Sequence, residues 1–249
     1  MMLAMASSER SATKASGRLG RALLRLLMKR AAVVAVERLA DRFRLITLEG
    51  AALAGVTWTP GQKIQIAMGS AFVARTYTPI TWDADAGRTC VLGCVHGNGP
   101  GSAWVGWVEP GDECHIFGPR TSLDARRLAG SLAVFGDETS IGLAAALAVQ
   151  DKTRSITCHF EVADVESGRK VVQQLGFDNA VLFAKRADDA HLQEMEAALP
   201  ALVAAGASFV LTGKAGTIQR LRRSLRQQAV AAPRIVTKAY WAPGKTGLD

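Results

Sequence analysis

The hydrophobic pattern of the chain changes its period once, near Leu128, and this change constrains the fold more than any other feature. Before Leu128, short segments alternate apolar and polar side chains, as in Lys63–Met68. After it, short apolar segments alternate with longer segments at helical spacing. A period of two indicates half-buried strands, whereas alternating strands and helices indicate a parallel sheet covered on both faces. The sequence therefore predicts an all-β unit followed by an α/β unit.

Six strands are predicted in the first unit, with turn signals at Pro60-Gly61 and Pro110-Gly111. They cover residues 33–36, 43–48, 63–68, 72–77, 89–95 and 113–117. Because they follow one another without room for helices between most of them, we expect a six-stranded antiparallel barrel.

Five strands and four helices are predicted in the second unit. The strands cover residues 132–136, 156–162, 180–185, 208–211 and 234–240, and the helices 140–149, 165–175, 190–199 and 217–228. This order predicts a five-stranded parallel sheet, whose ligands would lie at the carboxyl ends of the strands. We therefore expect domains at residues 31–127 and 128–249, with a site between them, after a basic segment at 1–30.

The basic segment shows helical spacing of apolar residues. Its apolar side is Leu19, Ala22, Leu23, Leu26 and Leu27, and its basic side Arg18, Arg21, Arg25 and Lys29. Such a helix either contacts a membrane or an acidic partner or is an ordinary surface helix. The net charge of +8 also favours an acidic partner. Nucleic acid is not expected, because no recognition motif accompanies the charge. No integral membrane segment is expected either, because Arg25 interrupts the apolar run.

The cysteines and histidines do not follow metal-site patterns. Cys90, Cys94, Cys114 and Cys158 form no Cys-x-x-Cys pair of the kind that zinc ribbons and many iron–sulfur clusters use. We expect them to be free core thiols in a reducing compartment, the cytoplasm. His115, His159 and His191 occur singly, so no metal site of the protein is predicted.

A first group of candidate ligands ends the fourth predicted strand. It consists of Arg75, Thr76, Tyr77 and Thr78, followed by Pro79. The guanidinium suits phosphate, the tyrosine ring offers a flat face, and the hydroxyl can bond a ring heteroatom. Together they suit a flavin. The alternative is an exposed strand end with a turn at Pro79.

A second group follows about twenty residues later. It consists of His96, Gly97, Asn98, Gly99, Pro100, Gly101, Ser102, Ala103 and Trp104. The glycines let the backbone approach a ligand, and Ser102 is expected to cap a short helix whose amides would face a pyrophosphate. A plain turn from strand to helix is the alternative.

A third group lies where the first strand of the α/β unit leads into its helix. It consists of Gly136, Asp137, Glu138 and Thr139, followed by Ser140. This is the nucleotide position of a doubly wound fold, although the glycine spacing is not G-x-G-x-x-G. The two acids would repel a pyrophosphate, so they are expected to hold hydroxyl groups. A simple helix cap at Thr139 or Ser140 is the alternative.

These motifs, in this order and with Tyr240-Trp241 near the end, resemble the siderophore-interacting proteins, or ferric-siderophore reductases, of the ferredoxin-reductase superfamily. The resemblance implies FAD held by the first two groups and an electron donor that is NADH, NADPH or a ferredoxin. It places the third group on the nicotinamide side and Tyr240-Trp241 near the flavin. Two departures are Ile80-Thr81, where many relatives have a basic residue, and Gly213-Lys214, where many have Gly-Glu.

The resemblance implies reduction of a ferric siderophore with release of Fe(II). Because ferric siderophores are often anionic, the candidate substrate residues are the basic Arg120, Lys214, Lys238 and Lys245, although each can also be an ordinary surface charge. Two alternatives remain open, a flavin reductase serving another acceptor and a non-catalytic siderophore carrier.

The second α/β strand bears on the choice of donor. It ends with Glu161 and Asp164, which would accept ribose hydroxyls and predict NADH over NADPH. Lys185-Arg186 at the end of the third strand favours the opposite preference.

Overall fold

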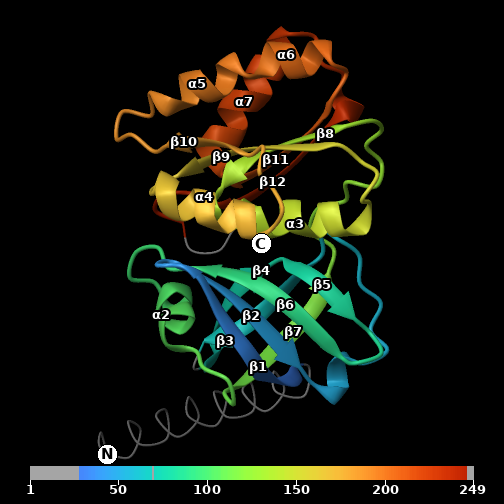
Figure 1. The fold of residues 1–249 in the computed structure, drawn as a ribbon, viewed down its shortest axis with the longest axis vertical. Coiled ribbons are helices and arrows are strands. Elements are labelled where there is room, and N and C mark those ends of the chain that lie inside the picture. Colours follow the sequence, from blue (N-terminus) through green and yellow to red (C-terminus); the bar gives the residue numbers. More distant parts are fainter. Residues whose placement is uncertain (1–27, 69, 246–249) are drawn as a thin grey trace, which may run out of the picture.

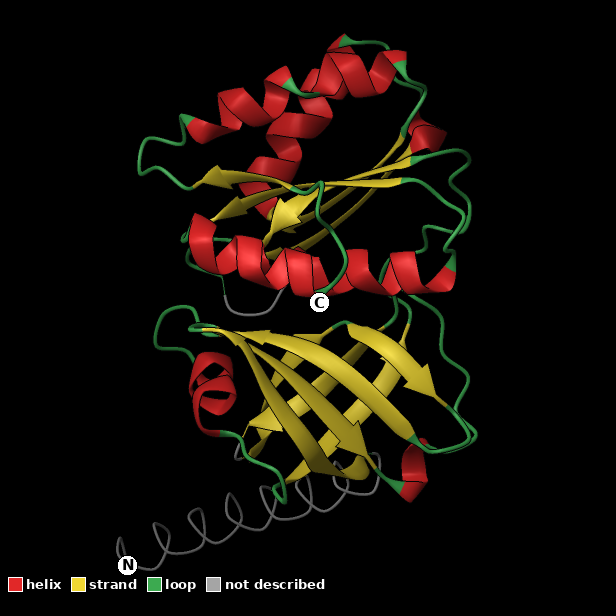
Figure 2. Cartoon of the chain, viewed as in Figure 1, coloured by secondary structure: helices red, strands yellow, loops and turns green. Residues whose placement is uncertain are grey.

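The chain forms two sheets, one antiparallel and one parallel, stacked end to end (Figures 1 and 2). The structure, a computed structural model, describes residues 28–68 and 70–245. The predicted basic helix falls on residues outside this range, except that Lys29 already belongs to the first strand. Within the described residues, no helix is long and apolar enough to cross a bilayer.

The first sheet has seven strands in the order β4-β3-β7-β1-β2-β6-β5, with antiparallel pairing throughout. The strands are β1 (Lys29–Ala40), β2 (Phe43–Glu49), β3 (Lys63–Met68), β4 (Ser70–Tyr77), β5 (Pro79–Asp83), β6 (Arg88–Cys94) and β7 (Glu113–Arg120). The short helices η1 (Ala51–Leu53) and α2 (Pro100–Trp107) lie in its connections. The sheet is barrel-like but not closed, because β4 and β5 are its edges.

The prediction of six strands missed β5. Pro79 was interpreted as a turn, but it is the first residue of this edge strand and pairs with Val91. A proline at the start of an edge strand removes no essential ladder bond, so the strand forms despite it.

The second sheet has five parallel strands in the order β10-β9-β8-β11-β12, as predicted. The strands are β8 (Leu132–Asp137), β9 (Ile156–Val162), β10 (Val181–Ala184), β11 (Ser208–Lys214) and β12 (Ile235–Trp241). In Figure 1, α3 (Ile141–Gln150) and α4 (Val165–Gln174) cover the face toward the first sheet. The opposite face is covered by α5 (His191–Ala197), α6 (Leu199–Ala204) and α7 (Ala215–Gln227). The helix predicted at 190–199 thus ends early, and Pro200 lies in the first turn of the next helix.

Two short 3-10 helices, η2 (Glu138–Ser140) and η3 (Ala232–Arg234), precede α3 and β12.

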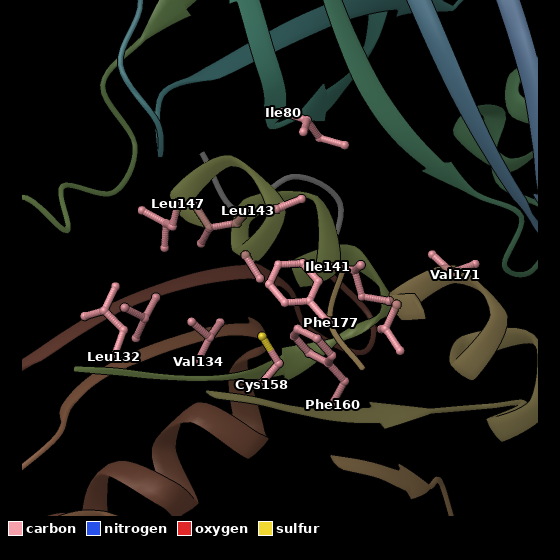
Figure 3. Packing of buried hydrophobic residues seen from close by; sticks show 14 of the residues in the cluster. Ile80, Leu132, Val134, Ile141, Leu143, Leu147, Cys158, Phe160, Val171 and Phe177 are labelled. Atoms are coloured by element: carbon pink, nitrogen blue, oxygen red, sulfur yellow. The ribbon is translucent and has the colours of Figure 1, made fainter. Parts of the chain in front are cut away.

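One of three buried apolar clusters among the described residues joins the two sheets. Ile80 of β5 belongs to the same buried cluster as Ile141 and Leu143 of α3, as Figure 3 shows. Gly142 lies at this contact, where an added Cβ would make ordinary van der Waals contact with the Thr78 carbonyl oxygen at 3.7 Å and with Ile80 at 3.8 Å. This contact fixes the end of β4 beside the start of α3, where the candidate site lies.

Candidate functional site

A cavity of about 410 Å³ lies between the two sheets. Thirteen of the predicted site residues line it: Arg75, Thr76, Tyr77, Thr78, His96, Gly99, Gly101, Ser102, Thr139, Lys238, Tyr240, Trp241 and Lys245. The remaining lining residues are Lys63, Ala74, Leu92, Cys94, Ser122, Gly142 and Ala239. The fold thus brings together parts of all three motif groups and the end of β12.

Arg75 and Tyr77 project from the edge strand β4 toward the start of α2. Gly101, in the first turn of α2, approaches both: a Cβ there would lie 3.1 Å from Cγ of Arg75 and 3.4 Å from the Tyr77 hydroxyl oxygen. The amides at a helix N-terminus have no intrahelical partner and attract anions. The aliphatic part of Arg75 and a helix N-terminus therefore meet in the cavity wall, and Nη1 of the guanidinium donates to the Ala74 carbonyl at 2.8 Å.

Tyr77 is supported from behind by Trp104 of α2. Their ring centroids are 5.5 Å apart, with the planes tilted by 57°. Trp104 is buried and does not line the cavity, so it supports Tyr77 and presents no face to a ligand. Burial raises the pKa of Tyr77 well above its usual range, so the hydroxyl stays protonated.

The glycine-rich turn before α2 is held by Ser102 in a different way from the predicted cap. Ser102 Oγ accepts from the His96 amide at 2.9 Å and donates to the His96 carbonyl. The N-cap residue is Gly99, which has no side chain to cap the helix. Pro100 follows it as the first residue of the helix. Gly97 has a positive φ of 62°, which favours glycine. Within this group, Gly97, Asn98, Pro100 and Ala103 lie outside the cavity lining.

The end of β12 forms the opposite wall. Tyr240 hydrogen-bonds to the side chain of Thr78, which links β12 to the end of β4. Burial raises the pKa of Tyr240 to about 12 despite this bond. Lys238 and Lys245 line the same region of the cavity and give it positive charge.

Trp241, the neighbour of Tyr240, is anchored to Asp137 at the end of β8. Its indole Nε1 donates to Asp137 Oδ2 at 2.6 Å, and the Thr139 amide donates to Oδ1 at 2.9 Å. Asp137 is fully buried, and burial raises the pKa of its carboxyl group against the opposing effects of Lys185, Thr139 and Trp241. Asp137 was predicted to hold a ligand hydroxyl, but both oxygens bond within the chain.

Gly136 and Glu138 also lie outside the cavity lining. A Cβ at Gly136 would lie 2.2 Å from Ser140 Oγ, so this glycine makes room for Ser140. Glu138 accepts from the Ala163 amide at 2.6 Å and forms an ion pair of 2.5 Å with Lys185. Of the third group, only Thr139 reaches the cavity.

Glu161 and Asp164, which were expected to bind a ribose, accept hydrogen bonds from other groups of the chain. Glu161 is buried and bonds to His191 Nε2 at 2.8 Å and to Thr217 Oγ1 at 2.7 Å. His191 accepts the Arg186 amide through Nδ1 at 3.1 Å, so Nε2 carries the proton given to Glu161. Asp164 caps α4 through the Glu166 and Ser167 amides. Both acids accept hydrogen bonds within the chain, so the sequence argument loses the free carboxylates on which it rested, and the preference for NADH stays a prediction.

Two of the four predicted substrate residues lie outside the cavity lining. Arg120 donates to Gln65 at 2.9 Å and lies over the Phe117 ring, and Lys214 forms a 3.0 Å ion pair with Asp189.

In residues 28–68 and 70–245, no group of three or more His, Cys, Asp or Glu side chains has the arrangement of a metal site.

The sequence analysis missed Lys63 and Cys94. Lys63 is only 7% exposed although it is charged, and it pairs with Arg120 in the register of β3 and β7. Its signal was a lysine at the head of an apolar strand, directly after the Pro60-Gly61 turn. Cys94 is a free thiol, as are the other three cysteines, and burial raises its pKa to about 12.

The lining residues fit a flavin nucleotide. One end offers Arg75 and a helix N-terminus close to a glycine that leaves no bulk in the way, which suits phosphate. The flat ring of Tyr77 and the hydroxyl groups of Thr78 and Ser122 suit a polar aromatic ring system. No Asp or Glu lines the cavity, so nothing in its wall repels an anion.

Comparisons with known proteins agree with this arrangement. The model of the siderophore-interacting FAD-binding domain matches residues 67–123, and the model of siderophore-interacting proteins matches residues 129–244. None of the curated proteins compared with the chain matches it in sequence.

Solved structures show the same fold at low identity. A siderophore utilization protein from T. fusca is 23% identical over 89% of this chain and 95% of that one, with a TM-score of 0.67. The siderophore-interacting protein SipS from Aeromonas hydrophila is 21% identical over 88% and 93%, with a TM-score of 0.71. Phthalate dioxygenase reductase is 14% identical over 88% and 70%, with a TM-score of 0.68. The two matching family models cover most of both sheets, and the chain belongs to the family of siderophore-interacting proteins.

Proposed function

We propose that the protein is an FAD-dependent oxidoreductase that reduces ferric siderophores and thereby releases Fe(II). The observation that carries the proposal is one cavity lined by Arg75 and Tyr77 from the first sheet and by Tyr240 from the second, with only basic residues among its charged members. A flavin bound there would supply the needed redox chemistry, since flavins accept electrons in pairs and release them singly.

Arg75 and the amides at the start of α2 would hold the phosphates. Tyr77, held in place by Trp104, would support the ring system, and Thr78 would bond a polar atom on its edge. Both tyrosines have raised pKa values, so each stays a neutral hydrogen-bond donor at neutral pH.

Lys63, Lys238 and Lys245 would attract the ferric chelate. A cavity whose charged members are all cationic raises the local concentration of an anionic ligand. Reduction to Fe(II) lowers the charge of the metal ion and so weakens the hold of an anionic chelator. The protein needs no iron ligands of its own for this reaction.

An anaerobic experiment tests the proposal. The purified protein is loaded with FAD, reduced with dithionite or by light, freed of reductant, and mixed with a ferric siderophore and a ferrous trap. We expect the flavin to be reoxidised while ferrous complex forms. Loss of siderophore reduction with retained transfer to other acceptors would identify a flavin reductase instead. A protein that binds the siderophore but no flavin would be a carrier.

A further inference from the structure

Lys63, the first residue of β3, is a charged side chain held in the wall of the cavity. It is only 7% exposed, whereas Lys245, which lines the same cavity, is exposed. Because water and salt screen a buried ammonium less than one at the surface, its field acts more strongly on neighbouring groups. The charge of Lys63 therefore acts chiefly on whatever fills the cavity.

The register of the strands places Lys63 beside Thr78. β3 runs antiparallel to β4, with Ile64 opposite Tyr77. One step further along both strands, this register brings Lys63 next to Thr78, and both residues line the cavity. Cβ atoms of directly opposed residues lie about 4.5–5.5 Å apart, which is within the reach of a long lysine side chain.

The backbone of Lys63 is held from the other side by β7. Lys63 is opposite Arg120, the last residue of β7, and a Cβ at Gly118 would lie 2.9 Å from the Lys63 carbonyl oxygen. The turn that leads into β3 is tied to the same region, because the Leu123 amide donates to the Gly61 carbonyl at 3.0 Å. The start of β3 cannot shift along the sheet without breaking these contacts, so the lysine side chain begins at a defined point.

Thr78 identifies the part of a bound flavin that Lys63 would meet. In the proposed function Thr78 bonds a polar atom at the edge of the ring system, and its bond to Tyr240 holds it in place. A ring that has taken up two electrons and one proton carries one more negative charge than the oxidised ring. A cation beside this edge favours the reduced ring by Coulomb attraction. Among the described residues that line the cavity, no Asp or Glu opposes this effect.

We propose that Lys63 raises the electron affinity of the flavin site by placing its ammonium beside the ring edge that Thr78 binds. This inference rests on the proposed function, since it requires a flavin in this cavity. The electrons and the proton come from the external reductant, and Lys63 keeps its own proton, so only the equilibrium between oxidised and reduced flavin changes. Lys238 and Lys245 are less buried and act on the arriving ferric chelate instead.

Equilibrium reduction of the FAD-loaded protein tests this role without a substrate. The protein is reduced slowly and anaerobically beside a dye of known potential, and the absorbances of flavin and dye give the midpoint potential. Lys63→Met removes the charge and keeps the length of the side chain, whereas Lys63→Arg keeps the charge. Lys152→Met is the matched control, because Lys152 is exposed in the turn after α3 and lies outside the cavity lining. The Kd values of oxidised and reduced FAD are measured for each protein.

We expect Lys63→Met to shift the equilibrium at least about tenfold toward oxidised flavin, a fall in midpoint potential of about 30 mV for two electrons. The Kd of reduced FAD should rise by the same factor relative to that of oxidised FAD. Lys63→Arg and Lys152→Met should keep the wild-type potential. A residue with only a structural role would weaken both flavin states equally and leave the potential unchanged, and this result overturns the inference. An equal fall in Lys152→Met overturns it too.

Lys63→Gln covers the case in which Lys63→Met binds no flavin. It also removes the charge, and it must show the same fall in potential. Loss of flavin in both neutral variants would overturn the inference in favour of a role in flavin binding. The proposed function is judged separately on the wild-type protein. Failure of that protein to bind FAD or to reduce a ferric siderophore refutes the function, whereas an unchanged potential in Lys63→Met refutes the inference alone.

Discussion

Gly213 and Asp137 are in contact across the ends of β11 and β8. Gly213 has a φ of +93°, and a Cβ there would lie 2.7 Å from Cγ of Asp137. Gly213→Ala should therefore lower the free energy of unfolding by about 1–3 kcal/mol, because it combines a strained φ with a clash against a buried carboxylate. Urea denaturation measures this loss.

Gly216→Ala is the matched control for that variant. Gly216 lies in the first turn of α7, where an added Cβ would meet nothing within 4 Å. Alanine is the better helix former, so the control should be neutral or stabilising by up to about 1 kcal/mol. Equal losses in the two variants would contradict the packing argument.

Flavin binding should depend on Arg75 and Tyr77. Arg75→Ala removes a phosphate partner and Tyr77→Ala a ring face, each contributing on the order of 1–3 kcal/mol. The Kd for FAD should rise about 5- to 150-fold, as followed by quenching of flavin fluorescence. Tyr77→Phe keeps the ring over Trp104 and should retain the flavin. Unaltered FAD affinity in both alanine variants would remove these residues from the site.

The positive charges of Lys238 and Lys245 should favour anionic ferric siderophores over neutral chelates as substrates. Lys238→Ala together with Lys245→Ala should slow reduction of anionic ferric siderophores several-fold, by weakening attraction of the ligand, and leave neutral chelates unaffected. Single-turnover rates with both kinds of chelate measure the difference. Arg222→Ala with Arg223→Ala is the control, because it changes the net charge equally on α7, on the face of the sheet away from the cavity (Figure 1). Equal slowing by both pairs would indicate a general charge effect.

The two tyrosines of the chain give a test in alkaline solution. Both pKa values are raised by burial, that of Tyr240 to about 12 and that of Tyr77 further. Unfolded tyrosines ionise near pH 10, so their contribution to stability is complete below about pH 10 and is lost as the pH rises through the folded values. Tyrosinate absorbance of the folded protein should stay low at pH 10, and Tyr77→Phe and Tyr240→Phe should assign the two steps. Half-ionisation of either residue near pH 10 before unfolding would contradict its burial.

The order of strands and helices could be predicted because the spacing of apolar residues differs between the two kinds of element. Segments such as Ile64, Ile66 and Met68 identified β3, and the fully buried run of β8 marked a central parallel strand. β5 was missed because Thr81 and Asp83 are polar on its exposed side and Pro79 resembles a turn. An edge strand carries little of the apolar signal that identifies strands in sequence.

The contents of the site could be predicted only in part. Arg75 and Tyr77 lie in a motif whose chemistry can be recognised from neighbouring residues. The partners of the acids could not be, because Trp241 meets Asp137 from 104 positions away and Thr217 meets Glu161 from 56. From the sequence, such a carboxylate seems free to bind a ligand. In the structure it accepts a hydrogen bond from a distant segment of the chain instead.

The common core of the two sheets determines how a ligand can enter. Ile80 of the first sheet is buried with Ile141 and Leu143 of α3, and Gly142, which lines the cavity, lies close to the Thr78 carbonyl. Swinging one sheet away from the other would expose this apolar surface to water at a cost of about 25 cal/mol per Å². This packing therefore opposes a hinge motion between the sheets, and we expect a ligand of the cavity to enter and leave without one.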